Sequence, residues 1–582
     1  MRTQRKLFAL FAAPALVLVG CGSGPDQPQT VAADFADALT RVDVAGAAAL
    51  TDDPAAATAA IDQLYEGLGK DVKFEVRSTE GDDFTLAATW KLGKGGAGQW
   101  SYTTAGTADE DDGWKIHWDP ATIAPGLTMG PLRYTPVAPA PARILDAAGG
   151  ELMTQQVVTL VNIAPGADLA AVAPVLSPLA PGLTAQSLQA DLAAAEGAPI
   201  TAITLRASDI EPIAATLAAI PGVTLAPQTR LLTTDKALSS PTLSGLADVW
   251  QSAAEVATGW SVRTVNPDGA ERVAGQDPRP TPDIRTTLDL GLQRNAEAAL
   301  ASIAQPAAIV ALQPSTGNVV AMAQNAAADA AGPIALTGLY PPGSTFKTVT
   351  VSAALQAGAV TPDTVLPCPG VADIEGRRIP NDDNFDLGPV ALHTAFARSC
   401  NTTMAALGVG LPPNALTTAA AQLGLGIDYL TPGLTTVTGK VPAAEIPAQR
   451  VESSIGQGQV TASPFGMALV AASIAHGSVP APVLIAGQPG VADRTPQPLP
   501  AGTADQLETM MRETVTAGTA TQLGDIPGLL GKTGTAEYGD NTRAHGWFVG
   551  IDGDLAFAVF VGDAGNSGPA VEAAGRMLRA PR

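Results

Sequence analysis

Positive charge is scarce in this chain. Lysine and arginine together number 33 against 55 aspartates and glutamates, which gives a net charge of −22 at pH 7. Affinity for a phosphate backbone comes mostly from lysine and arginine, so this balance argues against nucleic acid as a partner. It also argues against adhesion to an anionic lipid surface through a basic patch.

Long apolar runs are missing beyond the N-terminus, so no second membrane span is expected. At the N-terminus, basic residues within positions 2–6 precede an apolar run from Leu7 to Gly20, which is too short to span a bilayer and is typical of a signal peptide. The run ends Leu18-Val19-Gly20-Cys21, which resembles the bacterial lipobox. We therefore predict a lipoprotein signal peptide over 1–21 and a lipid anchor on Cys21. An ordinary signal peptide or an uncleaved anchor is the alternative.

Cysteine is also rare: besides Cys21, the chain holds only Cys368 and Cys400. An exported chain meets an environment that permits disulfides. The sequence does not show whether the two Cα atoms lie close enough to be bridged. A disulfide and two free buried thiols therefore both remain open.

At 582 residues the chain is too long for one core, and a hydrophobic content of 46% is typical of folded domains. Helix-like segments at 31–50 and 59–68 precede alternating, strand-like segments at 73–77, 84–90 and 114–118. A proline-rich linker, Pro136 to Pro141, follows. The predicted domains are a small α+β domain at 28–122, a pedestal domain without catalytic residues at 136–280 and a larger domain at 285–582.

Histidine is rarer than any charged residue type, with four in the chain. His117 stands alone beside Trp118, and no neighbour has metal-ligand spacing, so we predict a structural role. His393 and His545 are also interpreted as structural. We expect no metal site.

The first chemically suggestive pattern is Ser344-Thr-Phe-Lys347, which follows Pro341-Pro342-Gly343. Proline and glycine before a serine favour a helix start, with Ser344 near its N-terminus. Residues three apart share a helix face, so Lys347 is predicted beside Ser344. A desolvated lysine can take the proton of a serine hydroxyl and activate it as a nucleophile. Of the ten lysines, only Lys347 follows a serine by three residues, although a surface Ser–Lys pair is the alternative.

A second pattern is Ser399-Cys400-Asn401. Its hydroxyl can relay a proton and its asparagine amide can hold a substrate amide, although such a triplet also occurs as a turn cap.

The third pattern runs from Gly531 through Lys532, Thr533 and Gly534 to Thr535, and it is predicted to be extended. A cation and two hydroxyls at a strand edge can bind a carboxylate. A phosphate loop is excluded, because that motif needs a glycine five residues before the Gly-Lys pair and Asp525-Ile526 lies there.

These three patterns, in this order, resemble the motifs of the penicillin-binding proteins and serine β-lactamases. Further stretches are similar to class B penicillin-binding proteins and make the resemblance dense over 285–582: Thr286-Thr-Leu-Asp289, Phe396-Ala-Arg-Ser-Cys-Asn401, Ser454-Ile-Gly-Gln-Gly458 and Trp547-Phe-Val-Gly550. The segment Trp114 to Pro120 is similar to the end of the N-terminal domain of the methicillin-resistance protein and its lipoprotein relatives. Arg143 to Asp146 resembles the strand that opens the family's dimerisation domain, without the usual arginine-glycine pair.

The resemblance implies a multidomain α+β protein whose C-terminal transpeptidase fold is an antiparallel sheet flanked by helices. It implies that Ser344 is acylated by D-Ala-D-Ala stem peptides, with Lys347 as base and Ser399 as proton relay. Asn401 would hold the donor amide, and the carboxylate would bind at Lys532, Thr533, Gly534 and Thr535. β-Lactams would acylate the same serine, and no cofactor would be needed.

The same resemblance implies a chain on the outer face of the bacterial cytoplasmic membrane, with a membrane glycan polymerase and other division or elongation proteins as partners. A β-lactamase is disfavoured, because none of the glutamates between the second and third patterns is followed by asparagine within four residues. A β-lactam sensor would need further membrane helices. A D,D-carboxypeptidase stays open, since geometry decides between water and amine as acceptor. A catalytically weak scaffold should have lost a motif residue.

Overall fold

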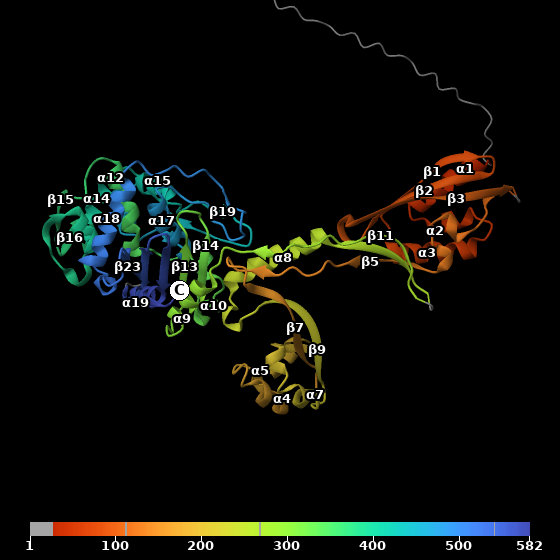
Figure 1. The fold of residues 1–582 in the computed structure, drawn as a ribbon, viewed down its shortest axis with the longest axis horizontal. Helices are drawn as coiled ribbons and strands as arrows, with labels where there is room; N and C mark the ends of the chain where they lie inside the picture. Colours follow the sequence, from red (N-terminus) through yellow and green to blue (C-terminus); the bar gives the residue numbers. More distant parts are fainter. Residues whose placement is uncertain (1–26, 111–112, 267–268, 540–541, 582) are drawn as a thin grey trace, which may run out of the picture. The chain divides into compact units, whose positions relative to one another are not determined.

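The computed structural model describes residues 27–110, 113–266, 269–539 and 542–581. Cys21 and the predicted signal peptide lie outside these residues. Within them, no helix is both long enough and apolar enough to cross a membrane. The chain divides into two compact units, one that joins residues up to 140 with 254–281 and one that joins 141–253 with the residues from 282 onward (Figure 1).

The first unit is a small α+β domain with a second, smaller sheet. Its four-stranded antiparallel sheet has the order β1-β2-β3-β4, and its three-stranded sheet has the order β11-β10-β5. Trp90 and Phe35 are fully buried in a core that α1, α3 and both sheets share. The elements are α1 (Pro28–Thr40), α2 (Val44–Ala49), α3 (Pro54–Leu68), β1 (Val72–Glu80), β2 (Asp83–Leu92), β3 (Gly98–Glu110), β4 (Trp114–Ile116), β5 (Leu132–Val137), β10 (Gly259–Thr264) and β11 (Arg272–Gln276).

The predicted single helix over 31–50 is wrong. The chain leaves the helix at Val42, whose φ is 60°, and Asp43 begins α2 by accepting a hydrogen bond from the backbone N–H of Gly46. An aspartate at this position caps a new helix, which the alanine-rich periodicity concealed. The predicted strands at 73–77 and 84–90 are confirmed as parts of β1 and β2, whereas β3 was not predicted.

Residues 136–280, which we predicted as one domain, are shared between the two units. The reason is long-range strand pairing: β10 pairs antiparallel with β5 from Gly259↔Val137 to Thr264↔Leu132. The segment at 259–276 therefore completes the sheet that β5 begins. Residues 141–253 belong to the second unit.

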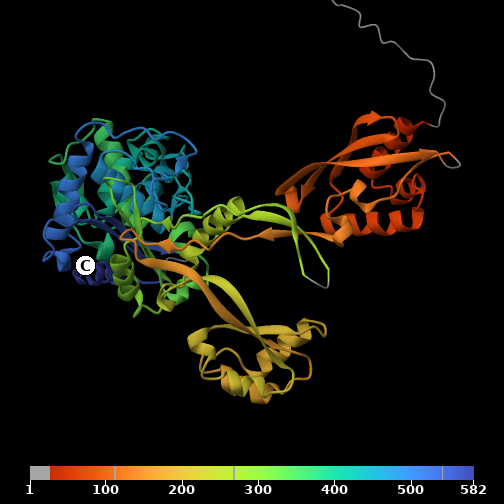
Figure 2. The same ribbon diagram turned by 45° about the vertical axis from the view of Figure 1, so that its right-hand side comes forward.

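The first part of the second unit is a five-stranded sheet in which the long strand β7 pairs with β6, β8 and β9. Short helices gather at the end of β7 and β9 (Figure 2) and form a small core with Val161, Ile163 and Val223. The elements are β6 (Ile144–Leu145), β7 (Glu151–Ile163), α4 (Leu169–Leu176), α5 (Ala185–Ala194), β8 (Ile200–Arg206), α6 (Ala207–Ile210), α7 (Ala214–Ala218), β9 (Val223–Thr233), α8 (Ser244–Ala257) and β12 (Ile284–Arg285).

The second part is built on an antiparallel sheet with the order β14-β13-β25-β24-β23 among the described residues. Its strands are β13 (Ala307–Leu312), β14 (Val319–Gln324), β23 (Leu530–Tyr538), β24 (Arg543–Ile551) and β25 (Ala556–Val561). Strands β13 and β14 pair antiparallel as a hairpin, and so do β24 and β25. The expected architecture of helices flanking an antiparallel sheet is thus present.

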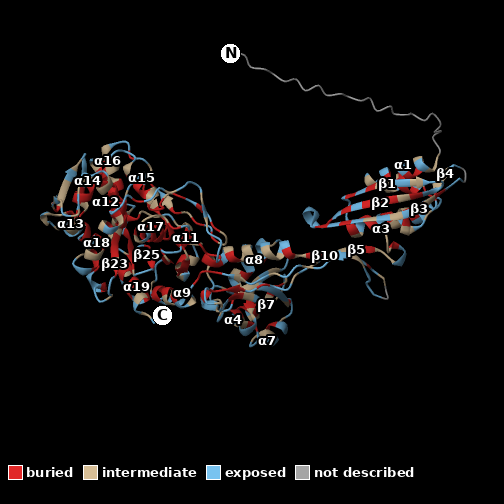
Figure 3. Ribbon diagram, turned by 45° about the horizontal axis from the view of Figure 1, so that its top comes forward, coloured by how far each residue is buried: buried red, intermediate tan, exposed pale blue. Residues whose placement is uncertain are grey.

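Both faces of this sheet are buried, which explains why β13, β14 and β25 read as nearly continuous apolar runs. On β13, Ala308 and Val310 face the core around the buried helix α17 (Pro464–His476). The alternate residues Ile309 and Ala311 face the second core under α9 (Leu290–Leu300) and α19 (Gly568–Arg579). Buried residues accordingly dominate the sheet and α17 (Figure 3).

The remaining elements surround this sheet and carry or support the motifs. The helices are α10 (Ala326–Asp329), α11 (Ile334–Thr337), α12 (Lys347–Gln356), α13 (Leu392–Ala397), α14 (Asn401–Val409), α15 (Ala415–Gln422), α16 (Pro447–Ser454) and α18 (Thr503–Thr516). The short strands are β15 (Val365–Cys368), β16 (Val371–Ile374), β17 (Arg377–Pro380), β18 (Gly388–Ala391), β19 (Tyr429–Leu430), β20 (Gly439–Lys440), β21 (Thr461–Ala462) and β22 (Val491–Ala492).

Candidate active site

The first motif lies in a tight turn that leads into a buried helix. Gly343–Phe346 form a 3-10 turn, and α12 continues from Lys347. Side chains three residues apart eclipse one another in a 3-10 turn, so Ser344 and Lys347 lie on one face, as predicted. The Ser344 side chain is half-buried, and its hydroxyl has no hydrogen-bond partner among the described residues.

One contact fixes this turn against the sheet, and another fixes it against the segment after α16. Trp547, fully buried on β24, donates its indole N–H to the carbonyl of Pro341 at 3.0 Å. The Gly343 N–H donates to the carbonyl of Gly456 at 3.0 Å. The predicted Ser454–Gly458 and Trp547–Gly550 segments thus both support the serine.

Gly343 is required where the turn touches β23. Its φ is +53°, and a Cβ there would lie 2.3 Å from the carbonyl oxygen of Thr535. That oxygen belongs to the backbone of the third motif and cannot move aside as a side chain can. The absence of a side chain at Gly343 therefore sets how closely Ser344 approaches Thr535.

A Gly343→Ala variant is expected to lower the rate of acylation by penicillin roughly 100-fold, because even a small displacement of a reacting group is costly. The rate of labelling by a fluorescent penicillin measures it. Gly358→Ala is the matched control: Gly358 also has a positive φ, +65°, but a Cβ there meets nothing within 4 Å. If the two variants acylate at equal rates, the close approach has no role.

The second motif connects the end of α13 to the start of α14. The Ser399 N–H donates to the carbonyl of Phe396, and the Cys400 N–H donates to the carbonyl of Ala395. This is the Schellman pattern, in which the left-handed residue is usually glycine. Here that residue is Ser399, with a φ of 63°. A side chain kept in a sparsely populated conformation indicates a functional constraint on Ser399.

The third motif lies on β23, the last strand of the sheet, which pairs with β24 on one side. Lys532 and Thr533 are buried, whereas Thr535 is partly exposed. The Thr533 hydroxyl lies 2.6 Å from that of Thr519. A Cβ at Gly534 would come within 2.8 Å of the Thr345 side chain, so this glycine lets the first motif lie against the strand.

The three motifs converge on the Ser399 hydroxyl. Lys347 Nζ donates to it at 3.2 Å, and Lys532 Nζ donates to it at 3.0 Å. Lys347 Nζ also donates to the Ser399 carbonyl at 2.8 Å and to Asn401 Oδ1 at 2.6 Å. Both lysine side chains are 0% exposed. The structure therefore brings together residues from all three patterns.

Burial changes the acid–base chemistry of both lysines. Removal from water disfavours the charged form, and this holds the pKa of Lys347 well below its ordinary value, with the nearby charge of Lys532 as the next cause. Burial alone lowers the pKa of Lys532 to about 7. Burial thus shifts Lys347 toward its neutral, basic form, while Lys532 keeps a cationic form below neutral pH.

Cys368 and Cys400 form a disulfide, which settles the alternative that the sequence left open. It joins the end of β15 to the central residue of the second motif, across a sequence separation of 32. Cys400 is fully buried.

Reduction of this disulfide is expected to lower the melting temperature by about 10 °C, because a loop of this length contributes about 4 kcal/mol to stability in the chain-entropy model. Thermal unfolding with and without reductant measures it. A Cys368→Ser/Cys400→Ser double variant should not respond to reductant. An unchanged wild-type midpoint after confirmed reduction would contradict the expectation.

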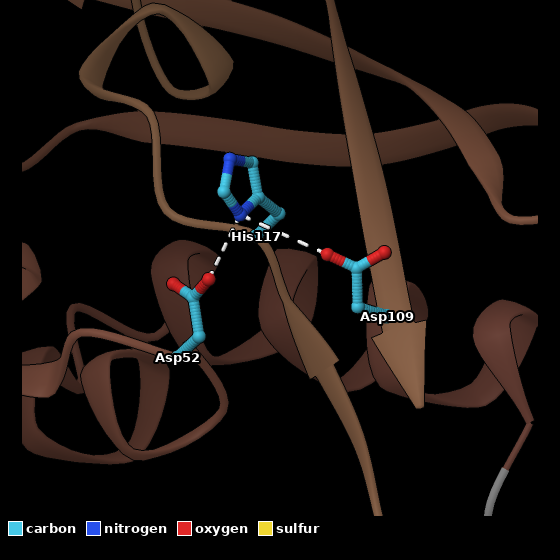
Figure 4. Close-up of side chains that lie close together, drawn as sticks. All are labelled: Asp52, Asp109 and His117. Carbon is cyan, nitrogen blue, oxygen red and sulfur yellow. Dashed lines mark hydrogen bonds and ion pairs between the residues drawn. The ribbon is translucent and has the colours of Figure 1, made fainter. Parts of the chain in front are cut away.

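His117, His393 and His545 each contact other side chains, and His393 Nδ1 lies 2.5 Å from Glu513 Oε2. His545 stacks on Tyr538 with ring centroids 4.1 Å apart. His117 does acquire acidic neighbours, which its sequence context did not predict: Figure 4 shows its ring between Asp52 and Asp109, with ligand atoms within 4.8 Å of one another. All three are exposed, and Asp52 also accepts the N–H of Trp118. These contacts tie the end of β4 to the segment after α2.

Two protein families match parts of this chain. Residues 307–579 match the penicillin-binding protein transpeptidase domain, and residues 27–130 match the NTF2-like N-terminal transpeptidase domain. The chain is 32% identical over 372 residues to the peptidoglycan D,D-transpeptidase PbpA of Mycolicibacterium smegmatis, which covers 54% of this chain and 73% of that protein. It is 29% identical over 369 residues to PbpA of Mycobacterium tuberculosis, with the same coverage of 54% and 73%.

Two solved structures are similar in fold. One is a penicillin-binding protein in complex with MreC from Helicobacter pylori, with a TM-score of 0.57, 17% identity and coverage of 77% of this chain and 98% of that chain. The other comes from a peptidoglycan synthase complex that coordinates polymerization and crosslinking, with a TM-score of 0.55, 26% identity and coverage of 77% and 91%.

The fold and the convergent Ser–Lys, Ser-x-Asn and Lys-Thr-Gly motifs define a serine acyltransferase of the penicillin-binding class. The identity of 32% to PbpA, over 73% of its length, narrows this class to one family. The chain belongs to the class B penicillin-binding proteins and is a peptidoglycan D,D-transpeptidase.

Proposed function

We propose that Ser344 is the nucleophile of this transpeptidase and that Lys347 is its base. The observation that carries the proposal is the burial of Lys347 on the same face as Ser344, with its amino group held by Ser399 and Asn401. A neutral Lys347 takes the proton from the Ser344 hydroxyl as Ser344 Oγ attacks the carbonyl carbon between the two terminal D-alanines. The backbone N–H groups of Ser344 and Thr535 stabilise the resulting oxyanion.

Collapse of this intermediate breaks the C–N bond and releases the terminal D-alanine, whose nitrogen receives the proton through the Ser399 hydroxyl. Asn401 orients the donor peptide amide. Lys532, with Thr533, Gly534 and Thr535, binds the terminal carboxylate at the free edge of β23. The amine of a second stem peptide then attacks the ester carbonyl, and Ser344 Oγ regains a proton as the acyl group leaves.

The acceptor distinguishes transpeptidation from the carboxypeptidase reaction. We test this with a thioester analogue of the donor stem, with and without a D-amino acid as amine acceptor. The proposal predicts an aminolysis product that grows with acceptor concentration and is lost in Ser344→Ala. Hydrolysis that the amine leaves unchanged would identify a carboxypeptidase, and no turnover by the wild type would identify a scaffold.

The proposal includes the location of the protein in the cell envelope. Peptidoglycan lies outside the cytoplasmic membrane, and a lipid on Cys21 would hold the chain at its outer face. The relatives seen with MreC and in a peptidoglycan synthase complex support a membrane glycan polymerase and other wall-synthesis proteins as partners. Metabolic labelling with a fatty acid tests the anchor: the wild type should be labelled and Cys21→Ser should not.

A further inference from the structure

Asn381 lies at the centre of the contacts that hold the second motif, although nothing in its sequence context distinguishes it from a turn residue. It follows β17 and is 2% exposed. Its Oδ1 accepts the backbone N–H of Asn401 at 2.8 Å and that of Thr402 at 3.2 Å. These are the first two residues of α14.

These two bonds replace a local cap. A helix leaves its first N–H groups without partners, and a residue just before it usually supplies a side-chain acceptor. Before α14 that position is Cys400, which makes no such bond and is committed to the disulfide. Asn381 therefore caps α14 from a segment that is 20 residues distant from Asn401.

The amide nitrogen of Asn381 contacts the segment that follows β15, opposite the start of α14. Nδ2 donates to the carbonyls of Pro369 and Phe385, both at 2.9 Å, and contacts Cys368 Sγ at 3.4 Å. One buried amide thus joins the segment around Cys368 to the start of α14, parallel to the covalent link through Cys400.

Pro380, which precedes Asn381, also contacts Asn401. The carbonyl of Pro380 accepts Asn401 Nδ2 at 2.9 Å, which leaves Asn401 Oδ1 to accept the amino group of Lys347 at 2.6 Å. The segment Pro380-Asn381 therefore fixes Asn401 by its backbone and by its side chain.

We propose that Asn381 is a positioning residue for acylation: by capping α14 it sets the place of Asn401 and Ser399 relative to Lys347. Asn381 acts through these residues and takes no part in proton transfer. The inference rests on the proposed roles of Ser344 and Lys347 in the reaction.

The test measures the acylation rate constant of the purified full chain with a fluorescent penicillin, well below the melting temperature. Asn381→Ala is expected to lower this rate roughly 100-fold, since the second motif loses its register with Lys347.

The chain offers a matched control in Asn325, which has the same bonding pattern away from the motifs. Asn325 Oδ1 accepts the N–H groups of Ala307 and Ala328, both at 3.1 Å, and its Nδ2 donates to the carbonyls of Ile303 and Gln305, both at 2.8 Å. Asn325→Ala also loses two accepted and two donated hydrogen bonds, including a helix cap. It should keep the wild-type acylation rate even if its melting temperature falls.

Asn381→Asp separates the two sides of the amide, because a carboxylate still accepts both N–H groups of α14 but cannot donate to the Pro369 and Phe385 carbonyls, so its rate should lie between those of Asn381→Ala and the wild type. Equal rates for Asn381→Ala and the wild type would overturn the inference, as would equal losses in Asn325→Ala and Asn381→Ala. An Asn381→Asp variant as slow as Asn381→Ala would also overturn it. No adduct on the wild type would overturn the proposed function, and this inference with it.

Discussion

A Lys347→Met variant is expected to react with penicillin about 10⁴-fold more slowly than the wild type, the upper range of what a positioned base contributes. The Ser344 hydroxyl has no hydrogen-bond partner among the described residues, and Lys347 is the amine on its face of the turn. The Ser344 hydroxyl would then have to attack without a base that removes its proton. The rate constant for adduct formation measures the loss.

The same variant should remain folded. Lys347 is 0% exposed and methionine fills a similar volume, but the Ser399 carbonyl and Asn401 Oδ1 lose their donor, which costs about 1–3 kcal/mol for each unpaired group. The melting temperature should therefore fall by only a few degrees, and rates measured well below it separate loss of chemistry from loss of structure. Lys440→Met, at an exposed lysine of the same domain, is the control and should acylate normally. A Lys347→Met protein that acylates within tenfold of the wild type would exclude Lys347 as the base.

The second prediction concerns pH and Lys532. The cation of Lys532 is proposed to bind the penicillin carboxylate, and burial lowers its pKa to about 7. The second-order rate of acylation reports the free enzyme. It should fall as the pH rises through about 7, because Lys532 loses its charge there. The rate should also rise with pH where Lys347 loses its proton, and burial lowers that pKa well below the ordinary value of lysine.

Two variants separate these limbs. Lys532→Arg keeps its charge at every accessible pH, so the decline near neutral pH should disappear. Lys532→Gln should lower the rate about 100-fold at pH 6, since a bond to a charged group is lost. It should also move the acid limb to higher pH, because the charge of Lys532 helps to depress the pKa of Lys347. An alkaline decline that Lys532→Arg leaves in place would assign it to another group.

The residues that meet at the site were predictable because they lie in short motifs. Ser344 and Lys347 share a face through local turn geometry, and Lys532 stands on a strand whose extended character was evident. The convergence of Lys347 and Lys532 on Ser399 followed only from the family resemblance, since 52 and 133 residues separate them along the chain. The structure supplies the geometry that the motifs left undefined.

The supporting contacts were not predictable from local sequence. Asn381 resembles any turn asparagine until Asn401 and Thr402 are placed beside it. The pairing near residue 259 was missed for the same reason: β10 pairs with β5 across more than a hundred residues, and no local periodicity encodes that partner. The break at Val42 was missed because a single left-handed residue is invisible within an alanine-rich helical pattern.

The most direct test of the central claim is the intact mass of the purified chain after incubation with excess penicillin, beside a Ser344→Ala variant. The account predicts that the wild type gains the mass of one penicillin, that the adduct persists for many minutes, and that the variant gains nothing. An adduct of equal yield on Ser344→Ala would show that another residue is acylated, and rapid loss of the adduct with turnover of the drug would identify a β-lactamase instead.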